Sequence, residues 1–266
     1  MALTGEAPFG LLAVGGGGRP PPMVDAAAAE AWWQVASFGH WRPRAVLLPP
    51  VELAADPARW CAGGGMGPGP RNAAALVRAA LLALPCGTDC PPGVVVVVAA
   101  PVAPHAWRVA EGGVPLAPGR WVRRYAALPE RASLGAWVHE LAHLLLDWPD
   151  LPGSPCLMGQ GAARAFGRDP APPGPALALA AGWLVAHSPT ATEAASDLGP
   201  GAAVALDWHG CRLLITRYGE ELAIHDQDRP GPPLAIGRIA DPDAPLLASA
   251  AAALARIADH PRAAAG

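Results

Sequence analysis

The strongest restriction on the fold comes from five consecutive valines at 94–98, bounded by Gly93 and Pro101. Valine is branched at Cβ and favours an extended backbone, and a run without polar alternation leaves no face suited to water. A strand of this kind has to be covered on both of its faces. We therefore expect 94–98 to be a central strand of a sheet.

Other apolar runs and their flanking residues indicate further elements around this strand. Strands are expected over 9–14, 44–48 and 120–126, and three short strands over 204–207, 212–217 and 222–224. Helices are expected over 24–35, 73–84, 176–185 and 246–258. Trp32, Trp33 and Val35 should form the buried side of the first helix, and Asn72 should cap the second.

Composition and charge exclude several classes of protein. The 266 residues carry 19 basic and 22 acidic side chains, a net charge of −3, so no basic field is available to hold a phosphate backbone. The uncharged stretch 174–186 is shorter than the roughly 20 residues that a membrane helix needs. We expect partners other than nucleic acid or membrane.

The location of the protein is inferred from its N-terminus and its cysteines. Arg19 follows the apolar stretch 8–14, whereas a signal peptide carries its charge before the apolar core. Five cysteines cannot all pair within one chain, and Cys86 and Cys90 have no second pair with which to form a zinc knuckle. A cytoplasmic protein with reduced thiols is expected, with secretion as the alternative.

Four glycines at 15–18 follow the expected first strand and precede Pro20, Pro21 and Pro22. A dinucleotide-binding turn needs a helix that opens on its glycines, and a run of prolines prevents this. The glycines therefore do not indicate a nucleotide site.

The segment 137–151 carries the motif H-E-x-x-H as His139, Glu140 and His143. Ser133 is placed to cap a helix that runs to about Asp147. Residues four apart lie on one face of a helix, so both imidazoles can bind one cation, and neutral imidazole suits Zn²⁺. Glu140 is then placed to act as a general base. Two surface histidines on an amphipathic helix are the alternative, but the leucines around them indicate burial.

A catalytic zinc site needs a third protein ligand. Asp147 continues the helical spacing but lies a further turn beyond His143, out of reach of a metal held between the two rings. Pro149 should force the chain out of the helix, so that Asp150 can fold back toward the metal. Asp150 is therefore the expected third ligand.

These residues resemble the immune inhibitor A family of secreted bacterial zinc metallopeptidases, which are related to the metzincins. The likeness includes the Pro149-Asp150-Leu151 step, the segment 156–159 with Met158, and Ala181-Gly182-Trp183-Leu184. It also includes the segment 32–39 and the pair Leu134-Gly135. The resemblance implies His139, His143 and Asp150 as zinc ligands, Glu140 as general base and Met158 as the methionine packed under the site.

The resemblance further implies an α/β (α+β) fold: a metzincin-like domain with a mixed twisted sheet, an active-site helix and a reduced C-terminal β region. A catalytic domain over 1–200 and a short C-terminal appendage over 201–266 are expected. The chain departs from the family pattern at Leu146, where many metzincin-like sequences carry a glycine that turns the chain. The motif does not identify either Tyr125 or Tyr218 as the residue that stabilises the oxyanion of the reaction.

The expected function is that of a zinc-dependent endopeptidase, in which a metal-activated water attacks a peptide bond and Glu140 transfers the proton. Its partner would be a protein or peptide substrate. A catalytically inactive metallopeptidase-like binding module is the alternative, motivated by the shortened C-terminal part. A zinc hydrolase that acts on something other than peptide is a further reading.

Overall fold

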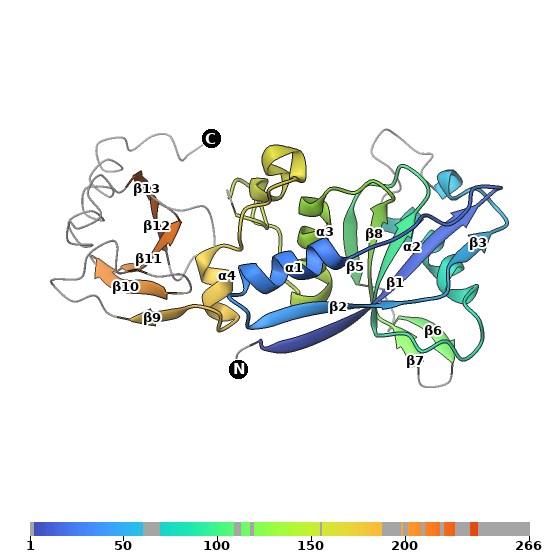
Figure 1. Ribbon diagram of the computed structural model, residues 1–266, viewed down its shortest axis with the longest axis horizontal. Coiled ribbons are helices and arrows are strands. Elements are labelled where there is room, and N and C mark those ends of the chain that lie inside the picture. The colour runs from blue at the N-terminus through green and yellow to red at the C-terminus, as the bar shows by residue number, and fades with distance from the viewer. Residues whose placement is uncertain are drawn as a thin grey trace.

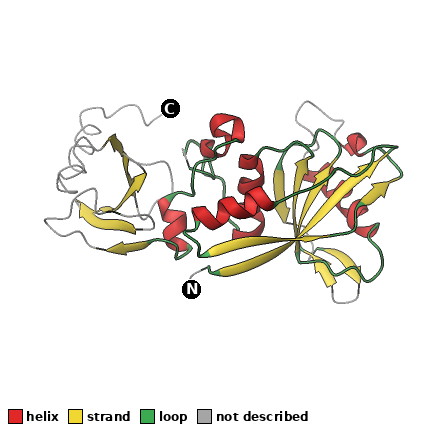
Figure 2. Cartoon of the chain, viewed as in Figure 1, coloured by secondary structure: helices red, strands yellow, loops and turns green. Residues whose placement is uncertain are grey.

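The computed structural model describes residues 3–60, 70–108, 113–117, 120–154, 156–187, 198, 202–208, 211–218, 221–226 and 235–238. They form a mixed α/β structure with a central six-stranded sheet and a second, five-stranded sheet (Figure 1). The two sheets lie toward opposite ends of the long axis; α4 lies between them, and α1 runs alongside β2 of the central sheet (Figure 1 and Figure 2). The expected helix over 246–258 lies outside the described residues.

The central sheet has the strand order β2-β1-β4-β8-β5, with β3 pairing β1 beyond the end of β2. Strands β1 to β4 and β8 run parallel, whereas β5 is antiparallel to β8. Their bounds are β1 Gly5–Gly16, β2 Trp41–Leu47, β3 Val51–Leu53, β4 Gly93–Val98, β5 His105–Arg108 and β8 Arg124–Pro129. The valine run is confirmed as a central strand, since β4 pairs with β1 and β8 and all six of its residues are buried.

The two faces of the central sheet are covered by different elements. Val95 and Val97 of β4 point into a core shared with α1 (Ala27–Ala36), α3 (Leu134–Leu141) and α4 (Pro175–Ala180). Val94, Val96 and Val98 point into a second core, which includes residues of α2 (Pro70–Leu82) and of the hairpin β6 (Val114–Ala117) and β7 (Arg120–Val122). The short helices are η1 (Pro57–Trp60), η3 (Ala142–Leu146) and η4 (Gln160–Gly167).

The second sheet has the order β13-β12-β11-β10-β9. Its bounds are β9 Val185–His187, β10 Ala202–Trp208, β11 Cys211–Tyr218, β12 Glu221–Asp226 and β13 Ala235–Arg238. The three expected strands are confirmed as β10, β11 and β12. Because β9 lies before residue 201, the sheet begins ahead of the expected appendage, and the boundary at 200/201 stays a prediction.

Four local expectations are wrong. Val35 is 77% exposed, because it lies about 200° around α1 from the buried Trp33. Helix α2 begins at Pro70, a favoured first helical residue, so the position expected for its cap, residue 72, lies inside the helix. The helix expected over 176–185 ends at Ala180, before the left-handed Gly182. The strand expected over 120–126 is two strands, because β7 pairs with β6 while β8 pairs with β4.

Tryptophans from distant parts of the chain form one cluster within the first core. Trp33 of α1 makes edge-to-face contacts with Trp32, Trp41, Trp148 and Trp183 at centroid distances of 5.0–5.9 Å. Trp41 also stacks on Trp183. The buried Ser37 hydroxyl accepts a hydrogen bond from the Trp41 N–H and donates one to its carbonyl, which ties β2 to the end of α1.

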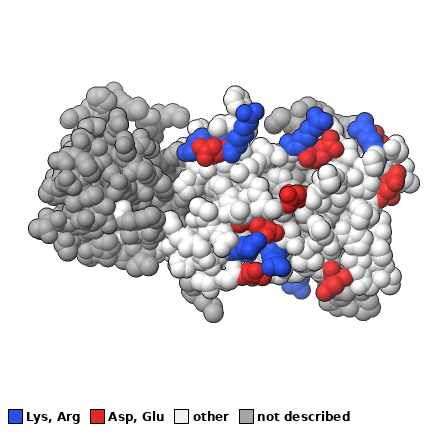
Figure 3. Space-filling model, viewed as in Figure 1, with Lys and Arg blue, Asp and Glu red and all other residues white. Residues whose placement is uncertain are grey.

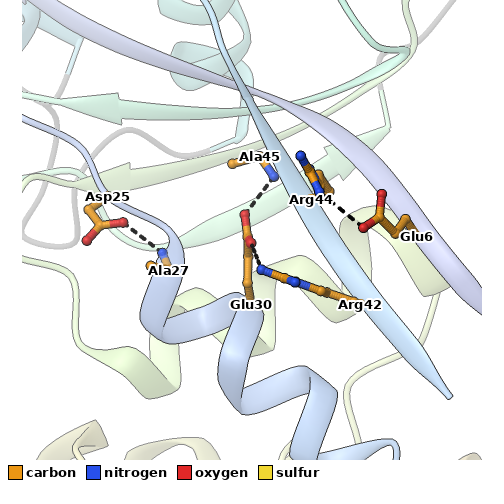
Figure 4. Close-up of polar contacts among 7 residues, drawn as sticks. All are labelled: Glu6, Asp25, Ala27, Glu30, Arg42, Arg44 and Ala45. Carbon is orange, nitrogen blue, oxygen red and sulfur yellow. Dashed lines mark hydrogen bonds and ion pairs between the residues drawn. The ribbon is translucent and has the colours of Figure 1, made fainter. Parts of the chain in front are cut away.

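Strand β2 is an edge of the central sheet, and α1 protects it (Figure 4). The Glu30 carboxylate accepts hydrogen bonds from the Ala45 N–H at 2.8 Å and from Arg42 at 3.1 Å. Satisfying an outward N–H in this way removes a template for pairing with another chain. The contact also fixes α1 relative to the sheet.

Candidate metal centre

Helix α3 carries the H-E-x-x-H motif and begins as the sequence predicts. The Ser133 side chain caps it by accepting a hydrogen bond from the Ala136 N–H at 3.3 Å. A Cβ at Gly135 would collide with the carbonyl oxygen of Ala162 in η4, so only glycine allows this close approach. The start of the helix is therefore held by its own cap and by tight packing on η4.

Helix α3 ends through a single π-helical turn, η3. The turn closes at Asp147, which adopts the left-handed conformation with φ 59° and ψ 28°. Asp and Asn tolerate this conformation better than most residues that carry a Cβ. Asp147 therefore turns the chain at a point that carries no glycine. Trp148 and Pro149 follow outside the helix, as expected.

The turn brings Asp150 back to the two histidines. Its Oδ1 lies 3.2 Å from Nε2 of His139 and 3.3 Å from Nε2 of His143, and the two Nε2 atoms are 3.0 Å apart. Asp147 points elsewhere, with Oδ1 3.5 Å from Nη1 of Arg124. The structure thus brings together the three residues expected as ligands and leaves Asp147 out.

Backbone carbonyls fix which ring nitrogens carry protons. Nδ1 of His139 lies 2.9 Å from the Leu157 carbonyl oxygen, and Nδ1 of His143 lies 2.5 Å from that of Trp148. A carbonyl oxygen only accepts hydrogen bonds, so each Nδ1 is a donor and each Nε2 of a neutral ring has a free lone pair. Burial lowers the pKa of His139, which favours the neutral ring.

The arrangement fits a metal ion. Two Nε2 lone pairs and a carboxylate oxygen converge with no proton between them, so a cation is the group that satisfies all three. In a tetrahedral complex with bonds of about 2.0–2.1 Å, ligand atoms lie about 3.3 Å apart. The observed separations of 3.0–3.3 Å match this spacing. His139, His143 and Asp150 can therefore hold a metal ion.

Glu140 lies beside this group with its carboxyl turned into a dry environment. The residue is only 5% exposed, and its Oε2 has no hydrogen-bond partner. Burial, and then the charge of Asp150, raise the pKa of Glu140 to about 8. A carboxyl with a pKa near neutrality can both take up and release a proton.

The group opens into a cavity of about 570 Å³. Its walls come from the beginning of β5, from Arg124 at the start of β8 and from the segment 139–150; the lining residues are Pro104, His105, Ala106, Arg124, His139, Glu140, His143, Leu144, Asp147, Trp148, Pro149 and Asp150. Arg124 donates to the Leu144 carbonyl at 3.4 Å, which anchors the π turn to the sheet. The cavity thus lies between helix α3 with its π turn and the edge strand β5.

Met158 belongs to the segment 156–159, whose backbone contacts the segments that carry the candidate ligands. It is fully buried, and its carbonyl accepts a hydrogen bond from the Leu151 N–H at 2.7 Å, next to Asp150. The preceding residue, Leu157, holds His139. The segment 156–159 therefore supports two of the three candidate ligands through its backbone.

Other polar residues lie away from the centre. Tyr125 is fully buried in the second core, on the opposite face of the sheet, so it does not reach the cavity. His105 lines the cavity, but its ring packs edge-on against Tyr125 at 5.7 Å. The Tyr218 side chain lies outside the described residues. The sequence analysis did not identify Arg124 or Trp148 as parts of the site. The position of Trp148 directly before Pro149 was a signal for that residue, and Arg124 had none.

No protein-family model and no curated protein matches this chain. No helix in the described part of the chain is long and apolar enough to cross a membrane. Cys86 and Cys156 form no disulfide. On the face shown in Figure 3, acidic and basic side chains of the described residues are interspersed.

Proposed function

We propose that this protein is a zinc-dependent endopeptidase of the kind that the resemblance to the immune inhibitor A family implies. The observation that carries the proposal is the convergence of three acceptor atoms beside a buried carboxyl whose free oxygen has no partner. Two imidazoles and one carboxylate are a ligand set that suits zinc. The open cavity beside them gives a substrate access.

His139, His143 and Asp150 would hold the ion, which supplies Lewis acidity to a water molecule and to the scissile carbonyl. Glu140 accepts a proton from the attacking water as the new C–O bond forms. It then delivers that proton to the amide nitrogen as the C–N bond breaks, which releases an amine and a carboxylate. Burial raises the pKa of Glu140, and a bound cation would lower that pKa again, so that the carboxylate can act as a base near neutral pH.

The position of the cavity supports an extended peptide as substrate. Residues 104–106, at the beginning of the edge strand β5, line the cavity. Within the described residues, β5 pairs with β8 only. An extended peptide can add to such an edge through main-chain hydrogen bonds, which recognise any sequence.

The test is cleavage of an unstructured protein such as casein by the zinc-loaded chain, with Glu140→Gln as the matched variant. Wild type should cleave, lose activity to a chelator and regain it with zinc. Glu140→Gln should lower the cleavage rate by about 10²–10⁴, because the base is lost. Its zinc content, measured by atomic absorption, should stay at the wild-type level.

Turnover by Glu140→Gln at the wild-type rate would refute the assignment of the base. Zinc binding by wild type without cleavage of peptides would instead favour the inactive binding module.

A further inference from the structure

We propose that Trp148 is a positioning residue of the metal centre, whose indole, held in the tryptophan cluster, sets the orientation of His143 and the return of Asp150. The inference rests on the proposed metal site but concerns residues outside the motif. Trp148 is the point where the cluster meets the ligand segment. Its ring is 8% exposed and packs against Trp33 at 5.9 Å and Trp183 at 5.5 Å.

The first step is the backbone of Trp148, which contacts one ligand directly. Its carbonyl oxygen accepts the Nδ1 proton of His143 and so keeps the Nε2 lone pair on the side of the metal. Its N–H donates to the Ala142 carbonyl at 3.4 Å, the same carbonyl that accepts the Asp147 N–H at the end of the π turn. A shift of this peptide group would rotate the imidazole away from its partners.

The second step is the link to Asp150. One residue, Pro149, separates the two, and its ring fixes φ near −65°. A displacement of Trp148 is therefore passed on to Asp150 with little freedom to absorb it. The Asp150 side chain is 67% exposed, so packing around it cannot replace this restraint. On its other side, the Leu151 N–H is bonded to the Met158 carbonyl.

The third step is the rigidity of the anchor. Trp33 and Trp183 are buried, and Nε1 of Trp183 donates to the Leu3 carbonyl at 2.7 Å. Trp41 packs on both of these rings, and Ser37 holds its backbone. The loop that carries a ligand is thus fixed by residues from α1, β2 and the segment after α4. Partners of this kind typically change metal affinity about 10–100-fold when they are removed.

The experiment compares Trp148→Ala and Trp148→Phe with the same substitutions at Trp41, which is also buried in the cluster. Trp41 has no ring contact with Trp148 among those of the described residues. Zinc affinity is measured by competition with a chromophoric chelator, and the stability of each metal-free variant by thermal unfolding. The visible absorption of the Co²⁺-substituted protein reports the geometry of the ligands.

We expect Trp148→Ala to bind zinc about 10–100-fold more weakly and to change the Co²⁺ spectrum, with Trp148→Phe between it and wild type. The Trp41 variants should lose stability but weaken zinc binding and alter the spectrum less than Trp148→Ala, because Trp41 is linked to Trp148 through Trp33 and Trp183. Equal loss of affinity at both positions, in proportion to the loss of stability, would overturn the proposal, as would wild-type affinity in Trp148→Ala. Absence of zinc binding in wild type would refute the proposed function itself.

Discussion

Replacing Asp150 and Asp147 separately by Asn tests which carboxylate holds the metal. The two substitutions remove the same charge and keep nearly the same size, and Asn tolerates the left-handed conformation of residue 147. Asp150 offers one of the three converging ligand atoms and the negative charge among them. Asp147 instead pairs with Arg124 in an exposed contact that is worth about 0–1 kcal/mol.

The expected magnitude follows from mass action. Zinc at 100 times its dissociation constant stabilises the folded chain by about 2.7 kcal/mol, which raises the melting temperature by about 5–11 °C in a domain of this size. Removing a residue that only contacts a metal ligand weakens metal binding by up to about 100-fold. Loss of a direct ligand should weaken zinc binding at least as much. At the same zinc concentration the stabilisation then falls to about 0.4 kcal/mol, or about 1–2 °C.

Thermal unfolding with and without zinc therefore distinguishes the two variants. Asp147→Asn should show the full zinc-induced shift, and Asp150→Asn should nearly lose it. The reasoning is refuted if Asp150→Asn retains the full shift while Asp147→Asn loses it.

Two further predictions concern stability. Gly135→Ala should destabilise the protein by about 1–3 kcal/mol or more, because its Cβ meets the Ala162 carbonyl. Gly93→Ala is the control, since its Cβ makes only an ordinary contact with Leu144. Equal midpoints of unfolding in urea for the two variants would contradict the prediction. Burial lowers the pKa of His225 to about 4, so the unfolded chain binds a proton that the folded chain excludes between pH 6.5 and 4. The contribution of His225 to stability is then fully present above pH 6.5 and about 2 kcal/mol smaller at pH 5 than at pH 7, and urea titrations at both pH values should show the wild type losing about 2 kcal/mol relative to His225→Leu.

Three expectations that depend on local chemistry agree with the structure. The valine run, the Ser133 cap and the break at Pro149 each depend on residues within a few positions of one another. In two of the four expectations that failed, a distant contact decided the outcome. Strand 120–126 divides because its two halves pair with different partners, and Val35 faces outward because Trp33, on the other side of α1, packs in the tryptophan cluster.

The sequence by itself determined that His139 and His143 share one helical face and that a proline forces the chain to leave that helix before Asp150. Both follow from helix geometry and the proline ring, which act within one or two turns. Only the tertiary structure decided the protonation of the imidazoles, through the carbonyls of Leu157 and Trp148, and the anchoring of the π turn by Arg124. It also placed Tyr125 on the far face of the sheet. These contacts join segments separated in the chain, and their formation depends on the packing of whole layers rather than on neighbouring residues.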